Sequence, residues 1–151
     1  ERHIAEAIAL NLKESFNISV PIISIVVGEG GSGGALGIGI GNRILILEHA
    51  YYSVISPEGC AAILWKDRAF SDQAAEALKI TGNDLIDLEL ADEIIKEPIG
   101  GAHTDKSEAA SFVKIAILKH LNELKFLTSD ALKSDRYNKF RKMGRFDGEI
   151  N

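Results

Sequence analysis

Five glycines within seven positions constrain this chain more than any other feature of its sequence. Residues 28–34 read Gly-Glu-Gly-Gly-Ser-Gly-Gly, and they follow an apolar run over residues 20–27 that predicts a buried strand. Glycine has no Cβ, so a ligand can approach the backbone closely and positive φ angles are accessible. Residues 33–41 predict a helix, whose first N–H groups have no partner within the helix. This glycine turn is therefore expected to present backbone donors to a negatively charged oxygen.

The glycine turn also matches nucleotide-binding motifs in part. A P-loop requires a lysine after its last glycine, and none follows here. Gly28, Gly30 and Gly33 have the G-x-G-x-x-G spacing of a dinucleotide site. Glu48 lies about 20 residues further on, where a ribose-binding carboxylate would stand. The additional glycines and the two strands predicted after the turn disfavour a dinucleotide fold.

Ser32 stands at the centre of a G-x-S-x-G sequence, which in some hydrolases carries a nucleophilic serine. A catalytic triad would also need a downstream carboxylate and a histidine. Glu58 or Asp92, together with His103, are available for these two roles. Because such partners occur often by chance, an esterase or protease hypothesis depends on these side chains meeting in space.

Metal-binding and redox chemistry are not indicated. Cys60 is the single cysteine, so the chain has neither an internal disulfide nor a thiolate zinc site, and a reducing intracellular compartment is expected. It lies among small apolar residues and is expected to be buried and unreactive. His49 and His103 are isolated, so we expect no metal on this chain. Trp65 is expected to pack in a core or an interface.

Composition excludes several classes of protein. The chain has 151 residues, 46% of them hydrophobic, and a formal net charge of −5, which indicates one globular domain and makes nucleic-acid binding an unexpected function. No apolar run is long enough to span a membrane. The tail over residues 128–151 is locally basic, and its cations predict a solvated face, with a subunit or nucleic-acid contact as the alternative. These cations include Lys139, Arg141, Lys142 and Arg145.

Hydrophobic periodicity and turn residues predict alternating helices and short strands, hence an α/β fold with a layered sheet. We expect the final helical third to pack outward, on its own chain or on a partner. Helical periodicity begins at once without a capping residue, which favours the later part of a longer polypeptide. Helices are expected over residues 1–17, 33–41, 56–66, 73–81, 84–88, 105–124 and 129–143, and strands over 20–27, 44–47, 51–55 and 93–96.

The glycines inside the predicted helix over residues 33–41 destabilise it, so another interaction must compensate for them. Gly37, Gly39 and Gly41 each cost about 1 kcal/mol relative to alanine in a helix interior. Gly37 and Gly41 fall on one face of such a helix, so close packing of another element against its backbone is expected to compensate.

Three segments in a fixed order resemble one known family. They are the glycine turn with its helix start (28–36), Tyr-Ser-Val-Ile-Ser-Pro-Glu-Gly-Cys-Ala-Ala-Ile-Leu-Trp-Lys (52–66) and Glu-Pro-Ile-Gly-Gly-Ala-His (97–103). Together they resemble the α subunit of the carboxyltransferase of multisubunit acetyl-CoA carboxylase. The resemblance implies a crotonase-like α/β fold, a spiral of ββα units with C-terminal helices. Residues 1–127 would be the C-terminal part of that domain, and residues 128–151 a helical, partly basic tail.

The resemblance also implies an activity and its partners. The family transfers a carboxyl group from carboxybiotin, held on a carrier protein, to acetyl-CoA, giving malonyl-CoA for fatty acid biosynthesis. The implied partners are a zinc-containing carboxyltransferase β subunit and the biotin carboxyl carrier protein, with an α2β2 heterotetramer as the assembly. The implied compartment is the bacterial cytoplasm or the plastid stroma.

By the same resemblance, Gly33 and Gly34 match the helix-start pair whose N–H groups form an oxyanion hole toward biotin. Gly30, Gly31 and Ser32 would line the turn. Carboxyl transfer places negative charge on the ureido oxygen, and one preorganised donor is typically worth about 3–4 kcal/mol. No side-chain base is then required, since decarboxylated biotin can take the methyl proton.

Two alternatives remain open from the sequence. Another crotonase-type acyl-CoA enzyme, such as a hydratase or decarboxylase, would need a catalytic carboxylate, for which Glu58 is the best candidate. A non-catalytic assembly subunit is the second alternative. The family's α subunit is about twice as long as this chain, so part of the biotin wall is expected to lie outside it.

Overall fold

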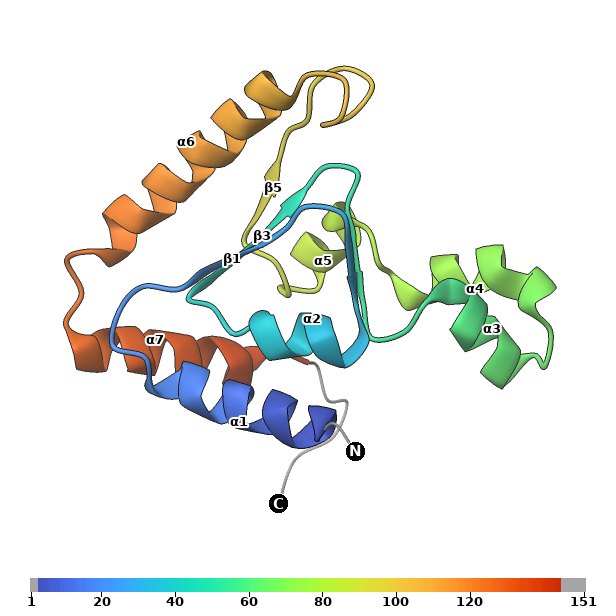
Figure 1. The fold of residues 1–151 in the computed structure, drawn as a ribbon, viewed down its shortest axis with the longest axis horizontal. Helices are drawn as coiled ribbons and strands as arrows, with labels where there is room; N and C mark the ends of the chain where they lie inside the picture. The colour runs from blue at the N-terminus through green and yellow to red at the C-terminus, as the bar shows by residue number, and fades with distance from the viewer. Residues whose placement is uncertain (1–2, 145–151) are drawn as a thin grey trace.

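The computed structural model describes residues 3–144, in which short parallel strands are surrounded by helices (Figure 1). Secondary structure follows the predicted order closely. The elements are α1 (Ile4–Asn17), β1 (Ile23–Val26), β2 (Glu29–Gly31), α2 (Ser32–Ile38), β3 (Arg43–Leu47), β4 (Tyr51–Ser53), α3 (Pro57–Leu64), the 3-10 helix η1 (Arg68–Phe70), α4 (Ser71–Leu78), α5 (Gly82–Asp87), β5 (Glu93–Ile95), α6 (Lys106–Leu124) and α7 (Ser129–Lys142).

The strands form two small parallel sheets, and the chain passes from the first sheet to the second twice. The larger sheet has the order β1-β3-β5, and the smaller pairs β2 with β4. Ile23 lies opposite Arg43 in the first sheet, and Gly30 lies opposite Tyr52 in the second. The segment from β1 to β2 bends between the two sheets, and so does the segment from β3 to β4. The two bent segments lie side by side and pair in parallel, β1 with β3 and β2 with β4. This arrangement confirms the predicted α/β fold, and the structure adds that its strands pair in parallel.

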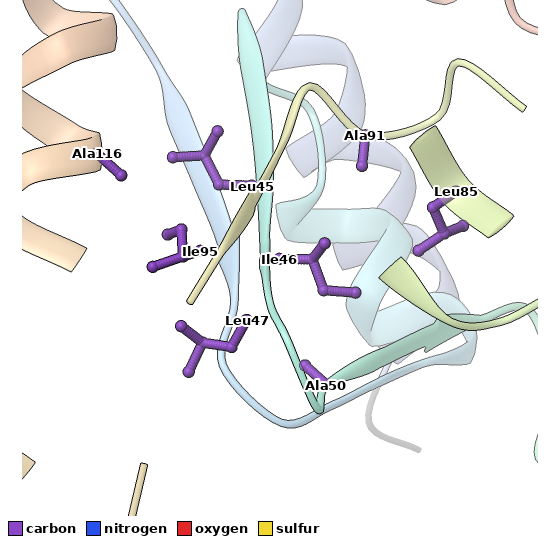
Figure 2. Packing of buried hydrophobic residues seen from close by; sticks show 8 residues of the cluster. All are labelled: Leu45, Ile46, Leu47, Ala50, Leu85, Ala91, Ile95 and Ala116. Atoms are coloured by element: carbon purple, nitrogen blue, oxygen red, sulfur yellow. The ribbon is translucent and has the colours of Figure 1, made fainter. Parts of the chain in front are cut away.

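The core is built around β3, the central strand of the larger sheet. Leu45 and Ile46 are fully buried, as expected for a parallel strand that is covered on both faces. Successive side chains of a strand point to opposite faces. Figure 2 shows Leu45 on the side of Ala116 from α6, and Ile46 on the side of Leu85 from α5.

The glycine-rich region differs from its predicted structure. The strand predicted over residues 20–27 is shorter, and Glu29–Gly31 inside the turn forms β2. The helix predicted over residues 33–41 ends at Ile38, so Gly39 and Gly41 lie outside it. A Cβ on Gly41 would stand 2.7 Å from the carbonyl oxygen of Arg43. Close approach of backbone, rather than a helix face, therefore explains this glycine.

Side-chain caps fix two of the helix starts, one of them where it was predicted. The Ser56 hydroxyl accepts a hydrogen bond from the N–H of Gly59, with Pro57 in the first helical position. Thr81 and Asp84 form a capping box, so α5 begins at Gly82, where the sequence predicted a break. The helix predicted over 73–81 is α4, which begins after η1 and ends at Leu78.

Helices α3 and α4 pack against each other with η1 and lie to one side of the sheets (Figure 1). Their small core contains Cys60, which is buried as predicted, together with Ala61 and Ala74. Trp65 stacks on Phe70 at a centroid distance of 6.3 Å and stays 36% exposed. Its packing is therefore local to this helical unit.

The final helices pack on their own chain. Helix α6 contacts β1 and β5, and α7 lies beside α1 (Figure 1). Lys139, expected on a solvated face, forms an ion pair with Asp92, with Nζ 2.6 Å from Oδ2. Arg141 and Lys142 are exposed, and Arg145 lies outside the described residues.

A fully buried arginine holds α7 against α1. The Arg136 guanidinium donates to the carbonyl oxygens of Ser15, Ile18 and Val20 at 2.8, 2.9 and 3.0 Å. It also donates to Oδ1 of the buried Asn42 at 2.9 Å. Helix termini leave carbonyl groups without intrahelical partners, and this side chain satisfies the one of Ser15 in the last turn of α1 and two in the segment that follows. Burial lowers the pKa of Arg136, while the charge of Asp135 opposes that shift.

Replacing Arg136 by methionine is expected to lower the free energy of unfolding by about 3–5 kcal/mol, because three carbonyl groups and the buried Asn42 side chain lose their donor. Urea unfolding measures the change. Arg141→Met, on the exposed face of the same helix, is the matched control and should change stability by less than about 0.5 kcal/mol. Equal effects of the two substitutions would contradict the proposed anchoring role of Arg136.

A second polar cluster joins α6 to β5. The Glu93 carboxylate lies 2.6 Å from Lys119 Nζ and 2.8 Å from Nε2 of the buried His120. Partial burial by itself raises the pKa of Glu93, but the hydrogen bonds from Lys119 and His120 outweigh burial and lower the pKa below its usual value of 4.5.

Since folding lowers this pKa, the ionised Glu93 stabilises the folded state above pH 4.5, and the gain is lost as the pH falls through the folded-state pKa. Glu93→Gln should therefore destabilise the protein by about 1 kcal/mol near neutral pH. The difference from the unsubstituted protein should shrink in acid, as measured by urea unfolding over a pH series. Glu76→Gln, at an exposed site, should show no such trend, and a pH-independent Glu93→Gln effect would refute the linkage.

Candidate functional site

The glycine turn lies where β2 runs directly into α2. Gly31 has extended backbone angles (φ −135°, ψ 148°) and caps the helix, and Ser32 follows with a φ of 57°. Positive φ is unusual for a residue with a Cβ, and it makes the chain turn sharply at this point. The short helix therefore starts at an abrupt bend, with its first N–H groups at the bend.

The N–H groups of Gly33 and Gly34 remain available. No side chain caps α2, and among residues 3–144 neither of these N–H groups donates a hydrogen bond. A Cβ on Gly34 would meet no atom within 4 Å, so open space lies beside this residue. A Cβ on Gly33 would stand 3.3 Å from Cδ1 of Ile8 in α1, so that residue is closer to the protein interior.

A cavity of about 390 Å³ opens beside the start of α2, and Ser32 and Gly33 line it. Most of its other lining is apolar, from leucines of α2, α4 and α5 and the segment after α5, while Lys79 adds one cation. An apolar wall next to free backbone donors can bind a ring system that carries an anionic oxygen. The remaining lining residues are Ala35, Leu36, Tyr52, Ser53, Val54, Leu78, Leu85, Leu88 and Leu90.

The structure does not assemble the hydrolase triad considered for Ser32. The Asp92 carboxylate accepts from the N–H of Ile44 at 2.7 Å and from Lys139. His103 lies in the loop before α6, beside Gly101. Within the described part of the chain no hydrogen bond joins Ser32 to either residue, so its geometry gives no support to an esterase or protease.

The two glutamates considered earlier have ordinary structural surroundings. Glu48 accepts a hydrogen bond from the backbone N–H of Glu97 at 3.1 Å, which links two loops. Glu58 is exposed in the first turn of α3, where a carboxylate is favourable to the helix dipole, and it does not line the cavity beside Gly33. Neither glutamate is therefore placed to act at the glycine turn.

Tyr52 is the residue at this site that sequence reasoning missed. Its hydroxyl donates to the carbonyl oxygen of Ala35 in α2 at 3.2 Å, and burial raises the pKa of the phenol. A Cβ on Gly30 would stand only 2.7 Å from Cδ2 of the Tyr52 ring. The aromatic residue opposite Gly30 in a parallel pair is visible only once the strand register is known.

Residues 3–144 contain neither a candidate metal-binding cluster nor a candidate membrane-spanning helix. No group of three or more histidine, cysteine, aspartate or glutamate side chains there is arranged to hold a metal ion. None of the helices in that range combines the length and apolar character that a membrane span requires.

Comparison with known sequences assigns the chain to a family. The model of acetyl co-enzyme A carboxylase carboxyltransferase-like proteins matches residues 1–144. The chain is 58% identical over 144 residues to the acetyl-coenzyme A carboxylase carboxyl transferase subunit alpha of Staphylococcus epidermidis, covering 95% of this chain and 46% of that protein. The same subunit of Geobacter metallireducens is 57% identical, with 97% and 46% covered. The subunit of Prochlorococcus marinus is 53% identical, with 97% and 44% covered. The chain thus spans about half the length of the curated relatives it matches.

Solved structures with little sequence similarity share the fold. The chain superposes on a chain of a Pseudomonas malonate decarboxylase hetero-dimer with a TM-score of 0.70 at 16% identity, covering 91% of this chain and 55% of that one. The transcarboxylase 12S structure gives a TM-score of 0.56 at 16% identity, with 95% and 24% covered. The crotonase-like α/β fold predicted from the sequence is confirmed by these likenesses. Together with the sequence match over nearly the whole chain, they show that this chain belongs to the acetyl-CoA carboxylase carboxyltransferase α-subunit family.

Proposed function

We propose that this chain is part of a carboxyltransferase that moves a carboxyl group from carboxybiotin to acetyl-CoA, giving malonyl-CoA for fatty acid biosynthesis. The observation that carries the proposal is the match of residues 1–144 to the α-subunit family, at up to 58% identity among the relatives described above. The free N–H groups of the glycine turn support it, since this chemistry needs donors for a developing anion.

In this proposal Gly33 and Gly34 are the catalytic residues, and they act through their backbone. Their N–H groups donate to the ureido oxygen of biotin, which gains negative charge as the carboxylate leaves. Gly30, Gly31 and Ser32 bind the substrate by shaping the turn. Because the donors are fixed by the bend into α2, they need no reorganisation when the charge develops, which is the condition under which such donors are most effective.

The apolar cavity beside the turn supports the same assignment. Its leucine-rich wall lowers the local dielectric, which strengthens hydrogen bonds to an anionic oxygen at the cavity edge. The cavity is large enough for a small bicyclic head group, and Ser32 and Gly33 stand at its border. Carboxybiotin is a substrate delivered on a carrier protein in this scheme, so a resident cofactor on this chain is not required.

The proposed partners are a zinc-containing carboxyltransferase β subunit and the biotin carboxyl carrier protein, assembled as an α2β2 heterotetramer. Apolar side chains that remain exposed next to the site support an additional subunit there, among them Leu36, Ile38 and Val54. The relatives come from bacteria, including cyanobacteria, so we propose the bacterial cytoplasm or the plastid stroma as the compartment.

Gly34→Val is expected to lower kcat for carboxyl transfer by about 10²–10³, because a branched side chain in the open space beside Gly34 should hinder an oxygen that approaches the donors. The assay uses the complete carboxyltransferase that contains this chain, assembled with its β subunit. Gly28→Val is the matched control, because a Cβ there also meets no atom within 4 Å, and it should retain activity.

A Gly34→Val enzyme that transfers carboxyl groups at the unsubstituted rate would contradict the donor assignment. It would also favour the assembly-subunit alternative, provided that β still binds. Hydration of an enoyl-CoA by the unsubstituted enzyme, without carboxyl transfer, would instead favour the hydratase alternative.

Partner binding is tested separately by affinity purification of the tagged chain co-expressed with the β subunit. We expect β to be retained and zinc to appear in proportion to β, while the chain purified alone binds none, since its described residues hold no metal-ligand cluster. Failure of β to co-purify with the tagged full-length α subunit would overturn the proposed assembly.

A further inference from the structure

Helix α2 is too short to hold itself in place. It has seven residues, and a helix leaves its last four carbonyl groups without intrahelical N–H donors. Isolated helices of this length are also unstable in water. Its orientation must therefore be fixed by other parts of the fold, and the orientation of the Gly33 and Gly34 N–H groups depends on it.

Three side chains from three different elements donate to carbonyl oxygens of α2. Asn11 of α1 donates to Gly37, Ser24 of β1 donates to Ile38 at 3.0 Å, and Tyr52 of β4 donates to Ala35 at 3.2 Å. We refer to Asn11, Ser24 and Tyr52 as the α2 clamp. Each member satisfies a carbonyl in the part of the helix that needs an external donor.

Tyr52 is itself held in place through its backbone and around its ring. Its backbone N–H donates to the carbonyl oxygen of Ile80 at 3.1 Å, and its strand pairs in register with Gly30. Two glycines receive its side chain: a Cβ on Gly30 would clash with the ring, and a Cβ on Gly39 would clash with the hydroxyl. The ring therefore passes between the turn before α2 and the segment after it.

Tyr52 also stands next to the proposed donors. Ala35, whose carbonyl accepts its hydrogen bond, directly follows Gly34, and Tyr52 lines the same cavity as Ser32 and Gly33. We propose that Tyr52 is a positioning residue for carboxyl transfer, whose hydroxyl fixes the first turn of α2 and thereby aims the N–H groups of Gly33 and Gly34. This inference rests on the proposed function.

A positioning role differs from acid–base chemistry in a measurable way. The hydroxyl proton is engaged with a backbone carbonyl, and burial raises the pKa of Tyr52, so the side chain stays neutral near neutral pH. Its removal should then change the height of the pH–rate profile and leave the shape of that profile unchanged.

Tyr52→Phe keeps the ring and removes only the hydroxyl. In the complete carboxyltransferase, assembled with its β subunit, we expect kcat to fall about two- to tenfold, the range that corresponds to one hydrogen bond. The KM values should stay unchanged, because the lost contact is to protein rather than to substrate. Tyr137→Phe is the matched control, since it makes the same change at an exposed position of α7, and it should retain full kcat.

Ser24→Ala separates positioning from direct contact with substrate. Ser24 does not line the cavity beside Gly33, but its hydroxyl holds the far end of the same helix. If the clamp positions α2, Ser24→Ala should also lower kcat at constant KM. Thermal unfolding of each variant shows whether the fold is retained.

Three results would overturn the inference: unchanged kcat in Tyr52→Phe, a raised KM with unchanged kcat, or a loss of one limb of the pH–rate profile. A loss confined to Tyr52→Phe, with Ser24→Ala fully active, would also overturn it by pointing to substrate contact. Failure of the proposed function can be distinguished from failure of this inference, because the unsubstituted enzyme would then transfer no carboxyl group.

Discussion

The parallel pairing of the β1–β2 segment with the β3–β4 segment is the interaction on which the rest of this structure depends. It places β1 against β3 and β2 against β4, and it sets Gly30 opposite Tyr52. This register places the Tyr52 ring against Gly30, where the missing side chain leaves room for it. The ring in turn supports α2, and α2 carries the backbone donors of the proposed site. A shift of the register by one residue would send Tyr52 to the other face of the sheet.

Local sequence signals were sufficient for most of the element order. Ser56 with Pro57 and Asp105 with Glu108 fix helix starts through hydrogen bonds between neighbours, so their outcome does not depend on the rest of the chain. The apolar runs that became β1 and β3 were equally plain. By contrast, the extent of α2 depends on contacts with β1 and β4, and helical periodicity over residues 33–41 carries no information about them.

The glycine turn shows why a motif predicts a site better than it predicts the role of each residue. Gly30 makes room for the Tyr52 ring, whereas Gly34 faces open space, and the sequence shows both simply as glycine. The availability of the Gly33 and Gly34 N–H groups agrees with what the family resemblance implied, but their catalytic role stays a prediction. Tyr52 begins one of the three segments that resemble the family, but the sequence did not indicate its role, since that role depends on a partner 22 residues earlier in the chain.

The contacts of Arg136 have a consequence for the order in which parts of the chain can fold during synthesis. Its guanidinium satisfies carbonyl groups more than 110 positions earlier, in the last turn of α1 and just after it. During synthesis the Arg136 donor is missing until α7 has left the ribosome, so the contacts at the end of α1 form only after α7 is made. Contacts of such long sequence separation slow folding. Truncation before α7 would therefore leave the carbonyl groups at and after the end of α1 without this donor.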